Sequence, residues 1–130
     1  MHTNRIAQIR SLVFGTGLAV GLLFMSAAQA HVALVASTPA ANAVVAPPKQ
    51  IDLVFNERLV PRASRLELSV LRNGEVAGNI ERMAIEFVHD GKTLRANLHQ
   101  PLGAGVYRVR WRAVGTDKHP MTGEFRFTVQ

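Results

Sequence analysis

The amino-acid sequence predicts an all-β domain, a Greek-key sandwich or barrel of about seven short strands. Three observations support this class. Apolar and polar residues alternate with a period of two, turn dipeptides separate the alternating runs, and the chain after residue 30 shows no helical stripe. Strands of this kind bury one face and expose the other to water. Two packed layers of such strands suit the 100 residues from 31 to 130.

Seven runs of residues are the expected strands. The turn dipeptides Asn73-Gly74 and Asp90-Gly91 are typical of tight hairpins, and prolines mark the longer loops. Trp111 falls on the apolar side of its run, so we expect it to pack into the core. The runs with the clearest alternation are 51–56, 66–71, 107–113 and 124–129, and the further candidates are 32–36, 83–88 and 93–98.

Residues 1–30 have the features of a cleaved signal peptide. Arg5 and Arg10 precede an uncharged apolar stretch, 12–25, and the segment ends in the small-residue site Ala28-Gln29-Ala30. An uncleaved membrane anchor is the alternative, but a spanning helix needs about 20 apolar residues and this stretch is shorter and interrupted by glycines. We therefore predict a signal peptide over 1–30 and an exported domain over 31–130 that does not span the membrane once processed.

The amino-acid composition excludes some kinds of metal site and argues against a nucleic-acid partner. The chain has no cysteine, which excludes disulfides and cysteine-based zinc sites, and an exported domain without disulfides suits a bacterial periplasm. Without Arg5 and Arg10, 13 basic residues stand against nine acidic ones, a net charge of +4. The basic residues are dispersed except for Arg108, Arg110 and Arg112, which we interpret as the solvated face of one strand. We expect no nucleic-acid partner.

Cleavage after Ala30 would make His31 the first residue. A histidine there offers a metal ion both its ring nitrogen and its α-amine. Near the other end of the chain, Asp117 and His119 stand two residues apart before Pro120. In extended backbone, which a following proline favours, their side chains point the same way. Taken alone, this motif is equally typical of a surface loop whose aspartate caps a turn.

From His31 to its end, the chain resembles the CopC/PcoC family of periplasmic copper-binding proteins. The combination of leader, first histidine and D-x-H loop is more specific than any single part. The stretches that carry the resemblance are His31-Val32, 51–57 (IDLVFNE), 105–114 (GVYRVRWRAV) and 117–123 (DKHPMTG).

The resemblance implies a seven-stranded Greek-key β-barrel, immunoglobulin-like or cupredoxin-like, that holds one Cu(II) ion. Its ligands would be the amine and ring of His31, the ring of His119, and Asp117. Glu57 matches an acidic residue of the family close to that site, as an axial ligand or a neighbouring group; a strand-end carboxylate paired with Arg58 or Arg62 is the alternative. Nitrogen and oxygen donors of this kind suit Cu(II).

The chain departs from familiar family members in its methionines. Those members carry a methionine-rich segment that forms a separate Cu(I) site, whereas residues 31–130 contain only Met83 and Met121. We expect Met83 to pack in the core and predict no Cu(I) methionine site. His89, beside a turn dipeptide, and His99, at a strand end, are expected to be solvated.

The predicted function is that of a non-catalytic periplasmic copper carrier or buffer in copper resistance or copper uptake. By family analogy, its partner is an inner-membrane copper-transport protein of the CopD kind. Two other functions remain open from the sequence. A terminal histidine with a second histidine also occurs in the histidine brace of copper-dependent oxidative enzymes, and an exported Ig-like binding module without a metal would need neither histidine.

Overall fold

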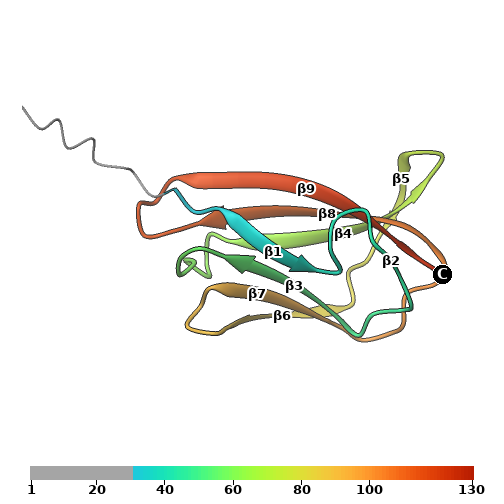
Figure 1. The fold of residues 1–130 in the computed structure, drawn as a ribbon, viewed down its shortest axis with the longest axis horizontal. Helices are drawn as coiled ribbons and strands as arrows, with labels where there is room; N and C mark the ends of the chain where they lie inside the picture. The colour runs from blue at the N-terminus through green and yellow to red at the C-terminus, as the bar shows by residue number, and fades with distance from the viewer. Residues whose placement is uncertain (1–30) are drawn as a thin grey trace, which may run out of the picture.

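A computed structural model describes residues 31–130; the predicted signal peptide, residues 1–30, lies outside the described residues. The described part forms two stacked sheets (Figure 1). No helix capable of crossing a membrane occurs in it. The nine strands are β1 (Leu34–Thr38), β2 (Val44–Val45), β3 (Gln50–Phe55), β4 (Arg65–Arg72), β5 (Glu75–Asn79), β6 (Met83–Val88), β7 (Thr93–Leu98), β8 (Gly105–Val114) and β9 (Pro120–Val129).

The strand order identifies a two-layer sandwich. One sheet has the order β1-β3-β7-β6 and the other the order β2-β9-β8-β4-β5. All pairs are antiparallel except β2 with β9, and the chain passes between the sheets after β1, β2, β3, β5 and β7. The prediction of an all-β fold is therefore confirmed, with a sandwich in place of the alternative barrel.

The prediction of seven strands is too low, because all seven runs form strands and two more are added. β2 is only two residues long and pairs in parallel with the end of β9. β5 has the sequence EVAGN, in which almost every residue is exposed. Neither segment has a buried face, so neither carries the alternation that identifies a half-buried strand.

Both predicted hairpin turns are present. Asn73 and Gly74 join β4 to β5 with φ angles of 50° and 81°. His89, Asp90 and Gly91 join β6 to β7 with φ angles of 51°, 59° and 73°. Asparagine, aspartate and glycine tolerate this left-handed conformation better than other residues, which explains why the dipeptides identify the turns.

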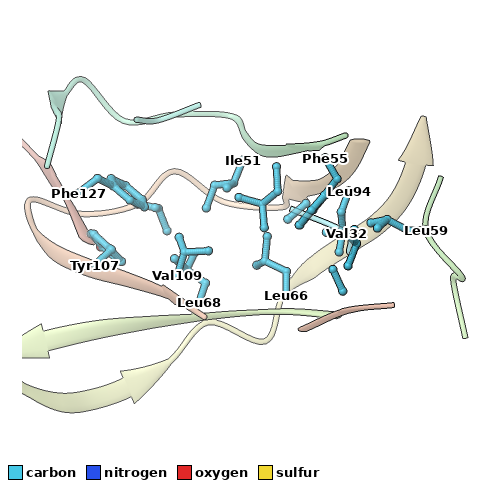
Figure 2. Packing of buried hydrophobic residues seen from close by; sticks show 14 of the residues in the cluster. Val32, Ile51, Phe55, Leu59, Leu66, Leu68, Leu94, Tyr107, Val109 and Phe127 are labelled. Carbon is cyan, nitrogen blue, oxygen red and sulfur yellow. The ribbon is translucent and has the colours of Figure 1, made fainter. Parts of the chain in front are cut away.

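The core lies between the two sheets, as Figure 2 shows. Alternate residues of β3 point into it, and so do those of β8 and β9. Burying each large apolar side chain contributes about 1.5–3 kcal/mol to the free energy of folding. Because the domain has no disulfides, its stability depends mainly on this layer. The buried cluster comprises Val32, Ile51, Leu53, Phe55, Leu59, Leu66, Leu68, Leu94, Ala96, Leu102, Tyr107, Val109, Ala113, Phe127 and Val129.

Trp111 closes one end of this core while staying partly exposed. Its ring meets Phe55 edge-on, with 5.3 Å between ring centroids. Gly123, opposite Trp111 on β9, leaves room for the indole, since a Cβ atom at position 123 would lie 2.4 Å from the ring. The expectation that Trp111 packs with the core is confirmed.

One ion pair links the strands at the centre of the four-stranded sheet. Asp52 on β3 stands opposite Arg95 on β7, and both carboxylate oxygens accept guanidinium hydrogen bonds of 2.8 Å. Both side chains are partly buried. The hydrogen bonds from Arg95 lower the pKa of the Asp52 carboxyl below its usual value, against the opposing effect of burial.

This pair predicts a specific loss of stability in acid. Because the pKa of Asp52 is lower in the folded state, its contribution is complete above its unfolded pKa, about 3.9. The contribution disappears as the pH falls through the lower folded value. Asp52→Asn should reduce the free energy of unfolding by about 1–3 kcal/mol at neutral pH, and the difference from wild type should shrink below pH 4. Urea unfolding from pH 2 to 7 measures this.

The matched control is Asp90→Asn, which removes an exposed turn carboxylate. It should follow the wild-type curve. A deficit of Asp52→Asn that stays constant down to pH 2 would contradict the assignment.

Candidate metal centre

Three segments that are distant in the sequence meet at one end of the sandwich. They are residues 31–33 before β1, residues 56–60 after β3, and residues 115–119 between β8 and β9. In Figure 1 the first described residues, in cyan, lie beside the loop that joins β8 to β9, and the C-terminus lies at the opposite end. The predicted site residues all belong to these segments.

His31, Asp117 and His119 come together as a cluster. Each offers one ligand atom, and these atoms all lie within 4.8 Å of one another. The Oδ2 atom of Asp117 lies 3.1 Å from Nδ1 of His31 and 3.5 Å from Nδ1 of His119. The two imidazole centroids are 5.7 Å apart with their planes tilted by 52°. One carboxylate oxygen thus lies near both rings, on a surface that solvent and ions can reach.

The backbone of the loop between β8 and β9 differs from the extended conformation expected from the two-residue spacing of Asp117 and His119. Residues 117–119 are not extended, because Lys118 adopts a left-handed φ of 63° and its N–H donates to the Gly115 carbonyl at 3.1 Å. The Asp117 Oδ1 atom accepts the backbone N–H of His119 at 3.1 Å. The two side chains converge because a tight turn with an aspartate hydrogen bond folds them together. The expectation of extended backbone here was wrong.

Asp117 is held in its charged form. The hydrogen bond from the His119 backbone N–H lowers the pKa of its carboxyl most, and the hydrogen bond with His31 and the charges of both histidines lower it further against partial desolvation. A carboxylate that stays ionised at neutral pH, with one oxygen near two imidazoles, is chemically suited to receive a cation.

Glu57 takes a different place from the other three predicted residues. Its carboxylate lies outside the cluster, and its Oε1 atom accepts the Thr116 N–H at 3.2 Å. It lies directly over Gly115, where a Cβ atom would fall 1.6 Å from Oε1. Within residues 31–130 it forms no ion pair with Arg58 or Arg62, so the alternative of a surface pair is wrong.

Two positions that shape the site were missed as site residues. Val32, next to His31, is 1% exposed and belongs to the core, which fixes the chain beside the first histidine. Asn56 hydrogen-bonds to residues on both sides of Val32. The apolar side chain of Val32 could have indicated from the sequence that this residue is buried. The contacts of Asn56 could not have been predicted, because they depend on the register of β1 against β3.

The remaining histidines and methionines lie elsewhere. His89 and His99 are exposed, as expected, and neither belongs to the cluster. Met83, on β6, packs against the core, as predicted. Met121, on β9 in the other sheet, is 38% exposed.

The donor set fits a metal ion of intermediate hardness. Two imidazoles and one carboxylate supply nitrogen and oxygen without sulfur, and cleavage after Ala30 would add an amine. Such sets bind Cu(II) and Ni(II) in tetragonal geometry.

The amino-acid sequence matches a known protein family and several named relatives. Residues 34–130 match the family described as the CopC domain. A relative named Copper resistance protein C, from Pseudomonas syringae pv. tomato, is 40% identical over 119 residues, which cover 90% of this chain and 94% of the relative. A protein of the same name from Escherichia coli is 37% identical over 117 residues, covering 88% and 91%.

Solved structures show the same fold. The methionine-rich copper resistance protein PcoC from Escherichia coli superposes with a TM-score of 0.70 at 36% identity, covering 78% of this chain and 100% of that one. CopC from Methylosinus trichosporium OB3b gives a TM-score of 0.64 at 26% identity, covering 77% and 94%. The resemblance predicted from the sequence is confirmed, and the chain belongs to the CopC domain family.

Proposed function

We propose that the processed chain is a periplasmic Cu(II)-binding protein that carries or buffers copper without catalysing a reaction, in copper resistance or uptake. The observation that carries the proposal is the cluster of His31, Asp117 and His119, whose ligand atoms lie within 4.8 Å of one another. The relatives named as copper resistance proteins support copper as the metal.

The free amine of His31 completes the proposed ligand set. After cleavage, the backbone nitrogen of His31 becomes an amine that can bind the same ion as its ring. One Cu(II) ion would then have two imidazole nitrogens, one amine and the Asp117 carboxylate. Glu57 serves in this proposal as the neighbouring group that holds the loop, because its Oε1 already accepts the Thr116 N–H at 3.2 Å.

The proposal includes no Cu(I) methionine site. Cu(I) prefers several soft sulfur ligands, and the methionines of the described residues, Met83 and Met121, lie in different sheets. The Escherichia coli relative is described as methionine rich, and this chain differs from it in that respect.

A carrier function agrees better with this site than oxidative catalysis does. A copper enzyme of the histidine-brace kind must cycle its ion to Cu(I), and the Asp117 carboxylate beside both rings favours Cu(II). We propose that an inner-membrane copper-transport protein of the CopD kind receives or supplies the ion, because residues 31–130 include no transport domain.

One prediction of the proposed function concerns the amine of His31. Protein that begins at His31 should bind one Cu(II) ion, whereas protein that begins at Ala30 should bind at least about 100-fold more weakly, because the added residue turns the amine into an amide and removes a ligand atom. Competition titration and electron paramagnetic resonance measure affinity and nitrogen ligation. His119→Ala should weaken binding comparably, and His99→Ala should not. Equal affinities of the two N-terminal forms would refute the site.

Another prediction of the proposed function concerns the pH dependence of copper affinity. Copper affinity of the processed protein should fall as pH decreases from 8 to 5, because protons compete for the amine, whose usual pKa is about 7.7–8.0, and for both imidazoles. In protein that begins at Ala30, His31 has no free amine, so its copper affinity should no longer change with pH above pH 7. The same competition titration, repeated at each pH, measures it; parallel curves for the two forms would contradict amine ligation.

A further inference from the structure

We propose that Asn56 is a positioning residue that holds His31 in place for metal binding. This inference rests on the proposed function, but it makes a separate claim about the metal-free protein. Asn56 follows β3 directly and lies beside the N-terminal segment, which must stay ordered if His31 is to remain near Asp117.

The contacts form a clamp around Val32. The Asn56 Oδ1 atom accepts the Ala33 N–H at 2.8 Å, and its Nδ2 donates to the His31 carbonyl at 3.2 Å. The backbone N–H of Asn56 donates to the Ala33 carbonyl at 3.1 Å. An asparagine side chain carries a donor and an acceptor together, so one residue satisfies backbone groups on both sides of Val32.

The clamp is needed because the sheet stops short of His31. The pairing of β1 with β3 begins at Leu34 opposite Phe55, with a shift in register before Ala36. Residues 31–33 therefore lie beyond the regular ladder, where chain termini fray unless something holds them. The buried side chain of Val32 and the amide of Asn56 hold this segment from opposite sides.

The neighbouring residue anchors the other half of the site. The Oε1 atom of Glu57 accepts the Thr116 N–H at 3.2 Å, so adjacent residues contact the His31 segment and the loop of Asp117. The segment is itself fixed, because the Leu59 N–H donates to Gly91 at 2.9 Å and the Val60 N–H donates to Val114 at 2.8 Å. Asn56 and Glu57 together set the separation between the two halves.

The test compares Asn56→Ala and Asn56→Gln with a control, Asn97→Ala on β7. Glutamine keeps both polar groups but displaces them by one methylene, so both variants should share the defect. In metal-free protein, the Ala33 amide should exchange its hydrogen at least about tenfold faster than in wild type. In processed protein, Cu(II) affinity should fall about 10–100-fold, as for other residues that orient a ligand.

Each outcome is informative. Faster exchange at Ala33 with an unfolding free energy no lower than that of Asn97→Ala supports a local clamp. Unchanged exchange, or unchanged copper affinity, overturns the positioning role. If wild-type protein binds no copper, the proposed function fails, while exchange at Ala33 still decides whether the clamp exists.

A different observation leads us to infer a docking surface on the outer face of the five-stranded sheet. Five arginines face outward there with two glutamates, a net charge of +3 on a single face. We call this surface the arginine face. Its charged members are Arg65, Arg108, Arg110, Arg112, Arg126, Glu67 and Glu124.

The strand register places like charges opposite each other. Arg112 pairs with Arg65 across β8 and β4, and Arg108 pairs with Arg126 across β8 and β9. Directly opposed like charges destabilise a sheet. The ion pairs on this face are long, 3.9 Å for Arg65 with Glu67 and 3.7 Å for Arg110 with Glu124.

One arginine lacks a partner for a buried donor. Within residues 31–130, the Nε atom of Arg108 is buried without a hydrogen bond. The same face has a hollow of about 240 Å³, which is lined by both ion pairs together with Arg112 and Thr122 but not by Arg108. The hollow lies two residues, roughly 7 Å along the strands, from the loop that bears His119.

The chemistry of this face fits an acidic protein segment. Carboxylates from a partner would neutralise the opposed arginines at the two ends of the face, which lie four residues apart along β8, about 13 Å. Glu67 and Glu124 flank Arg110 in the row between them, which carries a net charge of −1. An anionic lipid surface presents uniform negative charge and would be repelled by that middle row.

The test uses the peptide Glu-Glu-Gly-Gly-Glu-Glu, which carries its carboxylates at its two ends, and metal-free protein. Isothermal titration calorimetry measures the binding of the peptide. Neutralising Arg65 and Arg112 to Gln together should weaken peptide binding at least fivefold. The matched control neutralises the exposed Arg62 and Arg82, which carry the same charge elsewhere, and should weaken it less than twofold.

Equal weakening by the two double variants, or no binding by wild type, would overturn the docking surface. So would binding to anionic phospholipid vesicles that depends on Arg65 and Arg112 when the peptide does not bind. Near-ultraviolet circular dichroism establishes that both double variants are folded.

Discussion

Burial of apolar side chains between two sheets is the constraint on which the rest of this structure depends. The chain has no cysteine, so no covalent link holds the layers together. The same burial also fixes the three segments of the candidate metal centre, because each carries a core residue: Val32 beside His31, Leu59 after Asn56, and Val114 before the loop of Asp117. The site is therefore as well ordered as the end of the core to which it is attached.

The strands that have one buried face could be predicted from the sequence. β3, β8 and β9 alternate so regularly that their inner residues are identifiable from the sequence alone. β2 and β5 could not be predicted, because they lie at sheet edges and have no buried face. β2 depends on β9, which is distant in the sequence, whereas β5 pairs with β4, the strand directly before it.

For the candidate metal centre, the sequence singles out the residues that come together, but how they come together could not be predicted. Histidine and aspartate are conspicuous in a chain that has few of either, and the leader draws attention to His31. The convergence of Asp117 and His119 depends on a left-handed Lys118, a conformation that lysine rarely adopts and that no residue preference indicates. The contacts of Asn56 with residues 31–33 follow from the register of β1 against β3, which emerges only when the sheet has formed.

The sequence distance between the two halves of the site has a mechanical consequence. His31 and Asp117 are 86 positions apart, so a single ion bound to both would close most of the domain into one loop. A cross-link around a loop of about that length restricts the unfolded chain by roughly 4–5 kcal/mol in the chain-entropy description. Bound copper would therefore act as a removable cross-link between the two ends of the domain, a role that disulfides fill in many exported proteins. The copper-bound protein would then resist unfolding and proteolysis better than the copper-free one.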